Sequence, residues 1–212
     1  YDFIGSNQMK KLIVIFLLTS FHVKSEMVLN NPVIGKKAPE FSLNNEFDNK
    51  ISLLDFAGKY VILEWTNHEC PYVKRHYDEK NMQTTQKFAK EHDFIWLSII
   101  SSAPGKQGFI DTSTANALMK QRNSHEDHML FDEKGVVGRL YGAKTTPHMF
   151  IIDPEGYLIY QGGIDDIGGG AKFFRTNLKL ANNYINSAIE SILNKQKIVS
   201  DVTIPYGCSV KY

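Results

Sequence analysis

Apolar residues form several short runs along the chain, and their spacing predicts buried strands separated by amphipathic helices. Residues 60–65 and 93–100 are apolar and rich in β-formers, which is typical of central strands. Residues 72–90, between these two runs, carry apolar residues at roughly helical spacing. A strand, a helix and a second strand in this order predict a right-handed parallel unit.

The second half of the chain predicts further helices and a hairpin. Residues 111–122 show a helical pattern, and a short strand is expected near residues 128–131. Residues 148–153 and 157–160 flank a Pro-Glu-Gly turn and are expected to pair as a hairpin. Residues 177–195 have the apolar stripe of a last helix. We therefore predict an α/β sandwich with helices on both faces of a mixed sheet.

Composition and charge agree with one globular domain and argue against a nucleic-acid partner. The chain has 212 residues, of which 42% are hydrophobic and 22% charged, and this is enough apolar material for one sizeable core. Its 24 basic and 23 acidic residues leave a net charge of +1, so no strong field attracts nucleic acid.

The beginning of the sequence predicts export. Residues 9–25 combine a basic start, a short apolar run and a polar end, as a secretory signal peptide does. The apolar run is short for a bilayer span, although a membrane anchor or a buried strand would be alternatives. We expect residues 1–8 to be upstream sequence and residues 26–212 to be one domain. The mature form would be soluble and periplasmic or otherwise exported, in an oxidising compartment where disulfides persist.

Two cysteines, Cys70 and Cys208, carry the candidate chemistry. Cys70 follows the strand at 60–65, and Pro71 is the expected first residue of the next helix. A thiolate at a helix N-terminus is stabilised by free N–H groups and by the helix dipole, and Lys74 and His68 add positive charge nearby. The alternative is that Cys70 is a buried structural cysteine.

Cys208 lies in a Pro/Gly segment that looks exposed, beyond the last predicted helix. It would resolve a mixed disulfide or sulfenic acid on Cys70, or form a permanent disulfide with Cys70 that staples the segment. Two unpaired thiols are a third arrangement. The residues alone leave these three open.

Four stretches resemble a known family: residues 34–43 (IGKKAPEFSL), 64–73 (EWTNHECPYV), 141–153 (YGAKTTPHMFIID) and 206–212 (YGCSVKY). Together they are similar to the thioredoxin-fold redoxin-domain proteins of the AhpC/TSA, peroxiredoxin-like type that bacteria export. The resemblance covers about residues 33–212. It implies a thioredoxin-like three-layer sandwich with a mixed central sheet.

The resemblance also implies roles. Cys70 would be the nucleophile and Cys208 its resolving or disulfide partner. Thr146 and Pro147 would form a cis-proline edge on which substrate docks, whereas an ordinary trans proline at a strand start is the alternative. The substrate would be a protein disulfide, a small thiol or a peroxide, and no dissociable cofactor is expected.

Two departures from the family patterns matter. Val73 stands where thioredoxins have the second cysteine of C-x-x-C, so no local disulfide closes. Leu63 and Asn67 replace the proline and the threonine of the peroxiredoxin motif, and Pro147 falls where its arginine would be. Because peroxide cleavage needs positioned donors, a standard peroxidase is not expected.

We therefore predict a thiol–disulfide oxidoreductase or antioxidant redoxin, with Asn67, His68, Pro71 and Lys74 as supporting residues. One alternative is a non-enzymatic, disulfide-stapled domain that binds a partner or a metal. His68, His76 and His148 with Cys70 would suit copper or zinc, although His76 is expected on a solvated helix face and His148 at a strand edge. A weaker alternative is a thiol peroxidase that uses other donors.

Overall fold

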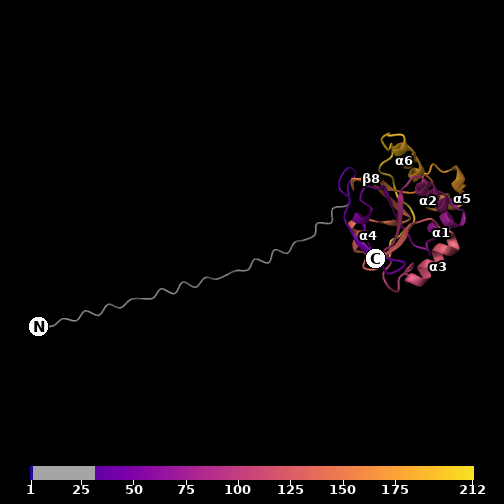
Figure 1. Cartoon of the computed structure of the whole chain (residues 1–212). Helices are drawn as coiled ribbons and strands as arrows, with labels where there is room; N and C mark the ends of the chain where they lie inside the picture. The colour runs from indigo at the N-terminus through magenta and orange to yellow at the C-terminus, as the bar shows by residue number, and fades with distance from the viewer. Residues whose placement is uncertain (2–31) are drawn as a thin grey trace.

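The computed structural model describes residue 1 and residues 32–212 (Figure 1). The predicted signal peptide at residues 9–25 lies outside this part, so it stays a prediction. None of the helices in the described part has the length and apolar character needed to cross a bilayer.

A seven-stranded mixed sheet forms the centre of the fold, in the order β2-β1-β5-β4-β3-β7-β8. In chain order the strands are β1 (Ser42–Asn45), β2 (Lys50–Ser52), β3 (Val61–Trp65), β4 (Ile95–Ile100), β5 (His128–Phe131), β7 (His148–Ile152) and β8 (Leu158–Gly162). Strands β3, β4 and β5 are parallel, whereas β7 pairs antiparallel with β3 and with β8. The predicted parallel unit and the predicted hairpin are both confirmed.

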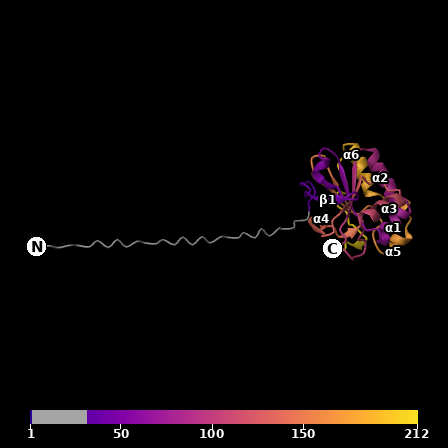
Figure 2. The same cartoon turned by 60° about the horizontal axis from the view of Figure 1, so that its bottom comes forward.

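Helices cover both faces of this sheet. They are α1 (Pro71–Asp78), α2 (Asn81–Glu91), α3 (Thr112–Arg122), α4 (Val136–Leu140), α5 (Ala171–Arg175) and α6 (Tyr184–Leu193), with 3-10 turns η1 (Leu53–Phe56) and η2 (Leu178–Leu180). Side chains alternate along β3: Ile62 packs into the core under α1, α2 and α6, and Leu63 into the core under α4. Figures 1 and 2 show α1, α2 and α5 on the side of the sheet away from α4. The predicted three-layer sandwich is confirmed.

The helix predicted over residues 72–90 is wrong in one respect, because it is two helices. Helix α1 ends at Asp78, and Lys80 adopts a left-handed conformation with φ 64° before α2 begins. At the break the Tyr77 carbonyl accepts from the Lys80 N–H at 3.1 Å and from the side-chain amide of Gln83 at 3.0 Å. The apolar spacing continues through the break, so the pattern alone does not reveal it.

The last helix is shorter than predicted, since α6 starts at Tyr184 and not at residue 177. Asn183 stops the helix from extending backwards, because its side chain accepts from the N–H groups of Ile185 and Asn186. The apolar residues before it, Leu178 and Leu180, belong to η2.

The end of the described chain is also more ordered than an exposed Pro/Gly segment. We call residues 201–212 the arm and residues 32–200 the body. Within the arm, β9 (Cys208–Ser209) pairs antiparallel with β6 (Thr145–Thr146) of the body. The arm ends beside α4, where the Tyr212 hydroxyl donates to the Ala143 carbonyl at 2.8 Å.

Candidate active site

Cys70 lies where β3 has ended and α1 begins. It is the N-cap residue of α1 with extended backbone, and Pro71 is the first helical residue, as predicted. The Cys70 side chain is 0% exposed. Its sulfur therefore lies at the start of α1 and under a cover of other residues.

The loop before Cys70 is held by Asn67. The Asn67 backbone carbonyl accepts from the Cys70 N–H at 3.0 Å, and its side-chain oxygen accepts from the Glu69 N–H at 2.9 Å. The Asn67 amide also donates to the Gln107 carbonyl at 3.3 Å. All of these bonds shape the loop, and one N–H of the Asn67 amide is used for this purpose.

Cys208 meets Cys70 from the arm. The two sulfur atoms lie 2.7 Å apart although the residues are 138 positions apart in sequence. Both cysteines are free thiols in the structure. The Cys70 thiol also donates to the Thr146 carbonyl at 3.2 Å, so one backbone edge and one second sulfur flank the same atom.

The Thr146–Pro147 peptide bond is cis. Thr146 is opposite Cys208 in the β6–β9 pair, and Thr145 is opposite Ser209. The structure thus brings together four of the predicted site residues, Cys70, Cys208, Thr146 and Pro147. The docking role of the last two stays a prediction.

Burial distinguishes the two thiols. It raises the pKa of Cys208 to about 12, and the hydrogen bond to Cys70 and its charge act in the same direction. Cys208 therefore keeps its proton at neutral pH. Because the thiolate is the attacking species, Cys208 in its docked position is a weak nucleophile at neutral pH.

The two predicted charge-supplying residues are placed differently. Lys74 is exposed one turn along α1 from Cys70. His68 is half-buried, and desolvation lowers its pKa, so it is neutral at physiological pH. Of the two, only Lys74 carries a positive charge under these conditions.

A group that the sequence analysis missed holds the arm just before Cys208. The Tyr206 hydroxyl donates to Asp165 Oδ1 at 2.5 Å and lies 3.1 Å from His76 Nε2. Because the phenol has one proton, it accepts from His76 Nε2–H, and His76 Nδ1 in turn accepts from the Asn81 amide at 2.8 Å. Burial, followed by the charge of Arg75, lowers the pKa of His76 to about 3.

The prediction that His76 is solvated is therefore wrong, since it is 0% exposed. His148 is likewise buried in β7, a central strand, and not at a strand edge. Within residues 32–212, no three Cys, His, Asp or Glu side chains are arranged to hold a metal ion. Both ring nitrogens of His76 are already hydrogen-bonded, so its place does not fit the histidine and cysteine metal cluster.

A second missed group is the carboxylate of Glu64 in β3. Burial raises its pKa, and its Oε2 accepts from Trp96 Nε1 at 3.0 Å, from Ser98 Oγ at 3.3 Å and from the Tyr77 hydroxyl at 3.2 Å. The signal in the sequence was a charged residue inside the apolar run 60–65. Its partners lie far along the chain and give no local signal.

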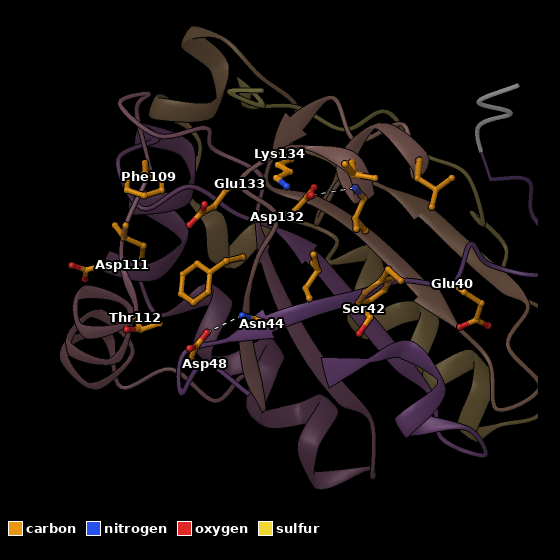
Figure 3. Close-up of a pocket in the computed structure, with 17 residues that line it drawn as sticks. Glu40, Ser42, Asn44, Asp48, Phe109, Asp111, Thr112, Asp132, Glu133 and Lys134 are labelled. Carbon is orange, nitrogen blue, oxygen red and sulfur yellow. Dashed lines mark hydrogen bonds between the residues drawn. The ribbon is translucent and has the colours of Figure 1, made fainter. Parts of the chain in front are cut away.

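A large groove lies elsewhere on the body. It has a volume of about 760 Å³ between β1, β5, α4 and the start of α3 (Figure 3). Its rim carries several carboxylates: Glu40, Asp48, Asp111, Asp132 and Glu133. None of the predicted site residues lines this groove. Asp132 is engaged there by the N–H groups of Val137 and Gly138.

Comparison with known families gives one match. The sequence model described as the AhpC/TSA family matches residues 34–161, more than half of the chain. No curated protein matches the chain.

Solved structures share the fold. An uncharacterised conserved protein from Geobacillus kaustophilus superposes with a TM-score of 0.74 at 21% identity, covering 86% of this chain and 94% of its own. A hypothetical protein from Sinorhizobium meliloti gives 0.70 at 21% identity, covering 86% and 96%. A Chlorobium tepidum protein with the provisional name thiol:disulfide interchange protein DsbE gives 0.51 at 27% identity, covering 62% and 85%.

Proposed function

The chain belongs to the AhpC/TSA family, and from this premise we propose that it is an exported thiol–disulfide oxidoreductase whose redox couple is Cys70 and Cys208. The observation that carries the proposal is the 2.7 Å approach of the two sulfur atoms beside the Thr146 carbonyl. The provisional name of the Chlorobium tepidum protein supports the same class of reaction.

In the reducing direction, the Cys70 thiolate attacks one sulfur of a substrate disulfide. A Cys70–substrate disulfide forms, and the other substrate sulfur leaves as a thiolate with the electron pair of the broken bond. Cys208 then attacks the Cys70 sulfur and forms the Cys70–Cys208 disulfide. The second substrate sulfur departs as a thiol with the proton of Cys208, and the first thiolate takes its proton from water. The substrate has thus gained two electrons from the cysteine pair and one proton from Cys208. The reverse sequence oxidises a dithiol.

Export would keep this couple in an oxidising compartment. The support is the basic start and apolar run of residues 9–25, together with a cysteine pair placed to form a disulfide. Thr146 and Pro147 would dock the substrate backbone beside the Cys70 sulfur.

A redox titration tests the proposal. The protein is equilibrated in a series of glutathione buffers, its thiols are alkylated, and the products are weighed by mass spectrometry. We expect a Cys70–Cys208 disulfide that opens within the glutathione range, at about −180 to −260 mV. The variant Cys208→Ser is the control, because it forms only a mixed disulfide with glutathione. A bond still closed below about −300 mV would contradict a catalytic couple.

One observation favours a second candidate, the disulfide-stapled domain without redox activity. The Cys70 side chain is 0% exposed under the arm, which suits a permanent bond. On the chain-entropy model, a disulfide that closes so long a loop would stabilise the fold by about 5 kcal/mol, so reduction would lower the free energy of unfolding by that amount. The same titration separates the two candidates, because a staple resists reduction.

A further inference from the structure

The arm lies where an extended polypeptide would lie if it were the substrate. Cys208 of β9 is opposite Thr146 of β6, immediately before the cis Pro147. Gly207 brings the arm close to this edge: its φ is +137°, and a Cβ there would lie 2.0 Å from the Thr146 carbonyl oxygen. The backbone of the arm thus occupies the edge of β6 beside the Cys70 sulfur.

A separate pocket of the body holds the side chain two residues before Cys208. Tyr206 is 6% exposed, and its ring lies 5.4 Å from that of Phe173 and 6.0 Å from that of Tyr72, centroid to centroid. Its hydroxyl reaches Asp165 and His76 at the bottom of the pocket. All four lining residues come from α1, α5 and the segment after β8, so the pocket belongs to the body and the arm only fills it.

The arm is held differently on the two sides of Tyr206. Upstream it is bonded to β8, since the Thr203 N–H donates to the Gln161 carbonyl at 3.0 Å and the Gln161 N–H donates to the Asp201 carbonyl at 2.9 Å. Downstream, β9 is only two residues long and neither of them is fully buried. Contacts that bury little apolar surface are the ones that open most readily. Once the Cys70–Cys208 bond is reduced, β9 and the residues next to it are therefore the part of this site that is able to leave.

We propose that the protein acts on extended polypeptides that replace the arm, and that the Tyr206 pocket selects an aromatic residue two positions before the reacting cysteine. This inference rests on the proposed function and names its substrate class. The protein's own tripeptide Tyr206-Gly207-Cys208 occupies the site as such a substrate would. It places an aromatic ring in the pocket, a small residue against β6 and a sulfur beside Cys70. A small thiol or a peroxide would use only the last of these three contacts.

The test uses the full chain with Cys208→Ser and a peptide that copies residues 205–209. The peptide cysteine is activated as a mixed disulfide with an aryl thiol. The Cys70 thiolate attacks the peptide sulfur, the peptide–aryl bond breaks, a Cys70–peptide disulfide forms, and the coloured aryl thiolate leaves with the electron pair. A second peptide has alanine in place of tyrosine, and a third has the tyrosine and the proline exchanged.

We expect the tyrosine peptide to react about tenfold faster than the other two, which corresponds to ~1.4 kcal/mol of selective binding. Phe173→Leu should reduce this preference to about twofold, because it removes a ring that touches Tyr206. Phe174→Leu is the control on the same helix α5. Phe174 is 51% exposed, and its ring packs on Phe173 and Tyr72 and not on Tyr206, so the preference should stay close to tenfold.

Equal rates for the three peptides would overturn the proposed selection of an aromatic residue, whatever the absolute rate. That result leaves the proposed function intact if the small aryl disulfide alone still reacts with Cys70. A Cys70 that reacts with neither the peptides nor the small disulfide would instead overturn the proposed function, and this inference with it. A preference that persists in Phe173→Leu would also count against the pocket as its source.

Discussion

Cys70 and Cys208 meet at one point, but the body and the arm hold them in different ways. Cys70 is fixed by the end of β3, by the turn at Asn67 and by the start of α1, all of them within the sheet and its helices. Cys208 sits in a two-residue strand whose neighbours are one aromatic anchor and one backbone edge. The position of Cys70 follows from the body whatever its redox state, whereas that of Cys208 depends on the arm being docked.

The prediction with the largest expected effect tests which of the two sulfur atoms attacks the substrate and which one resolves the mixed disulfide. Cys70→Ser should lower the rate of reaction with a small aryl disulfide by more than about 10³-fold, since the nucleophile is gone. Cys208→Ser should retain the first step and accumulate the mixed disulfide on Cys70. Stopped-flow absorbance and mass spectrometry measure both. Loss of the first step in both variants would contradict these roles, because Cys208 would then be needed for the attack itself.

A pH effect tests the contact through which α1 holds the arm. The pKa of His76 falls from 6.5 to about 3 in the fold, so the fold favours the neutral ring. Its contribution to stability is therefore complete above pH 6.5 and is lost as the pH falls toward 3. The expected slope is up to about 1.4 kcal/mol per pH unit in this range. Urea unfolding at several pH values measures it.

His76→Asn is the variant that isolates this slope, because asparagine retains an amide donor but does not titrate. Asp165 faces the same hydroxyl, and burial raises its pKa, so its contribution has the opposite sign and is lost as the pH rises. Below pH 6.5 the free energy of unfolding of the variant should therefore fall less steeply than that of the wild type. The same pH dependence in both proteins would show that His76 is not the group responsible.

The next effect concerns the close approach at Gly207. Alanine there would meet the Thr146 carbonyl and would also adopt a φ that costs a side chain about 1–3 kcal/mol. We expect Gly207→Ala to undock β9 and to raise the alkylation rate of reduced Cys70 by at least about tenfold. Gly105→Ala is the control, since Gly105 also has positive φ but no neighbour within 4 Å. A similar rise in both variants would mean that general destabilisation, not the arm, exposes Cys70.

The sequence predicted the strands of the body and the loop that carries Cys70, but it predicted neither every helix boundary nor the docking of the arm. The runs 60–65 and 93–100 could be predicted as buried strands because their apolar pattern lies in consecutive residues. The start of α1 at Pro71 could be predicted for the same reason. The break at Lys80 was missed, since the apolar spacing passes through it and the compensating bond comes from the Gln83 side chain.

The arm depends on partners that are far away in sequence. Tyr206 is held by His76 and Asp165, 130 and 41 positions earlier, and no periodicity connects these three residues. His76 shares the buried face of α1 with Val73 and Tyr77, but a histidine adds nothing to the apolar pattern of a helix, and Asp165 lies in a loop without a pattern. The motif Tyr-Gly-Cys was visible, but its docking against Thr146 required the structure.

The smallest expected effect compares the two anchors of the arm on either side of Cys208. The Tyr206 hydroxyl donates to a buried carboxylate. The hydroxyl of the half-buried Tyr212 donates to the Ala143 carbonyl, where a water molecule is able to take the place of the hydroxyl. Tyr206→Phe should cost the docked arm about 1 kcal/mol and raise the alkylation rate of reduced Cys70 about fivefold. Tyr212→Phe should raise it about twofold or less. Because both changes remove one oxygen, their ratio reports which anchor holds the arm, and a larger effect at Tyr212 would place the hold beside α4 and not in the aromatic pocket.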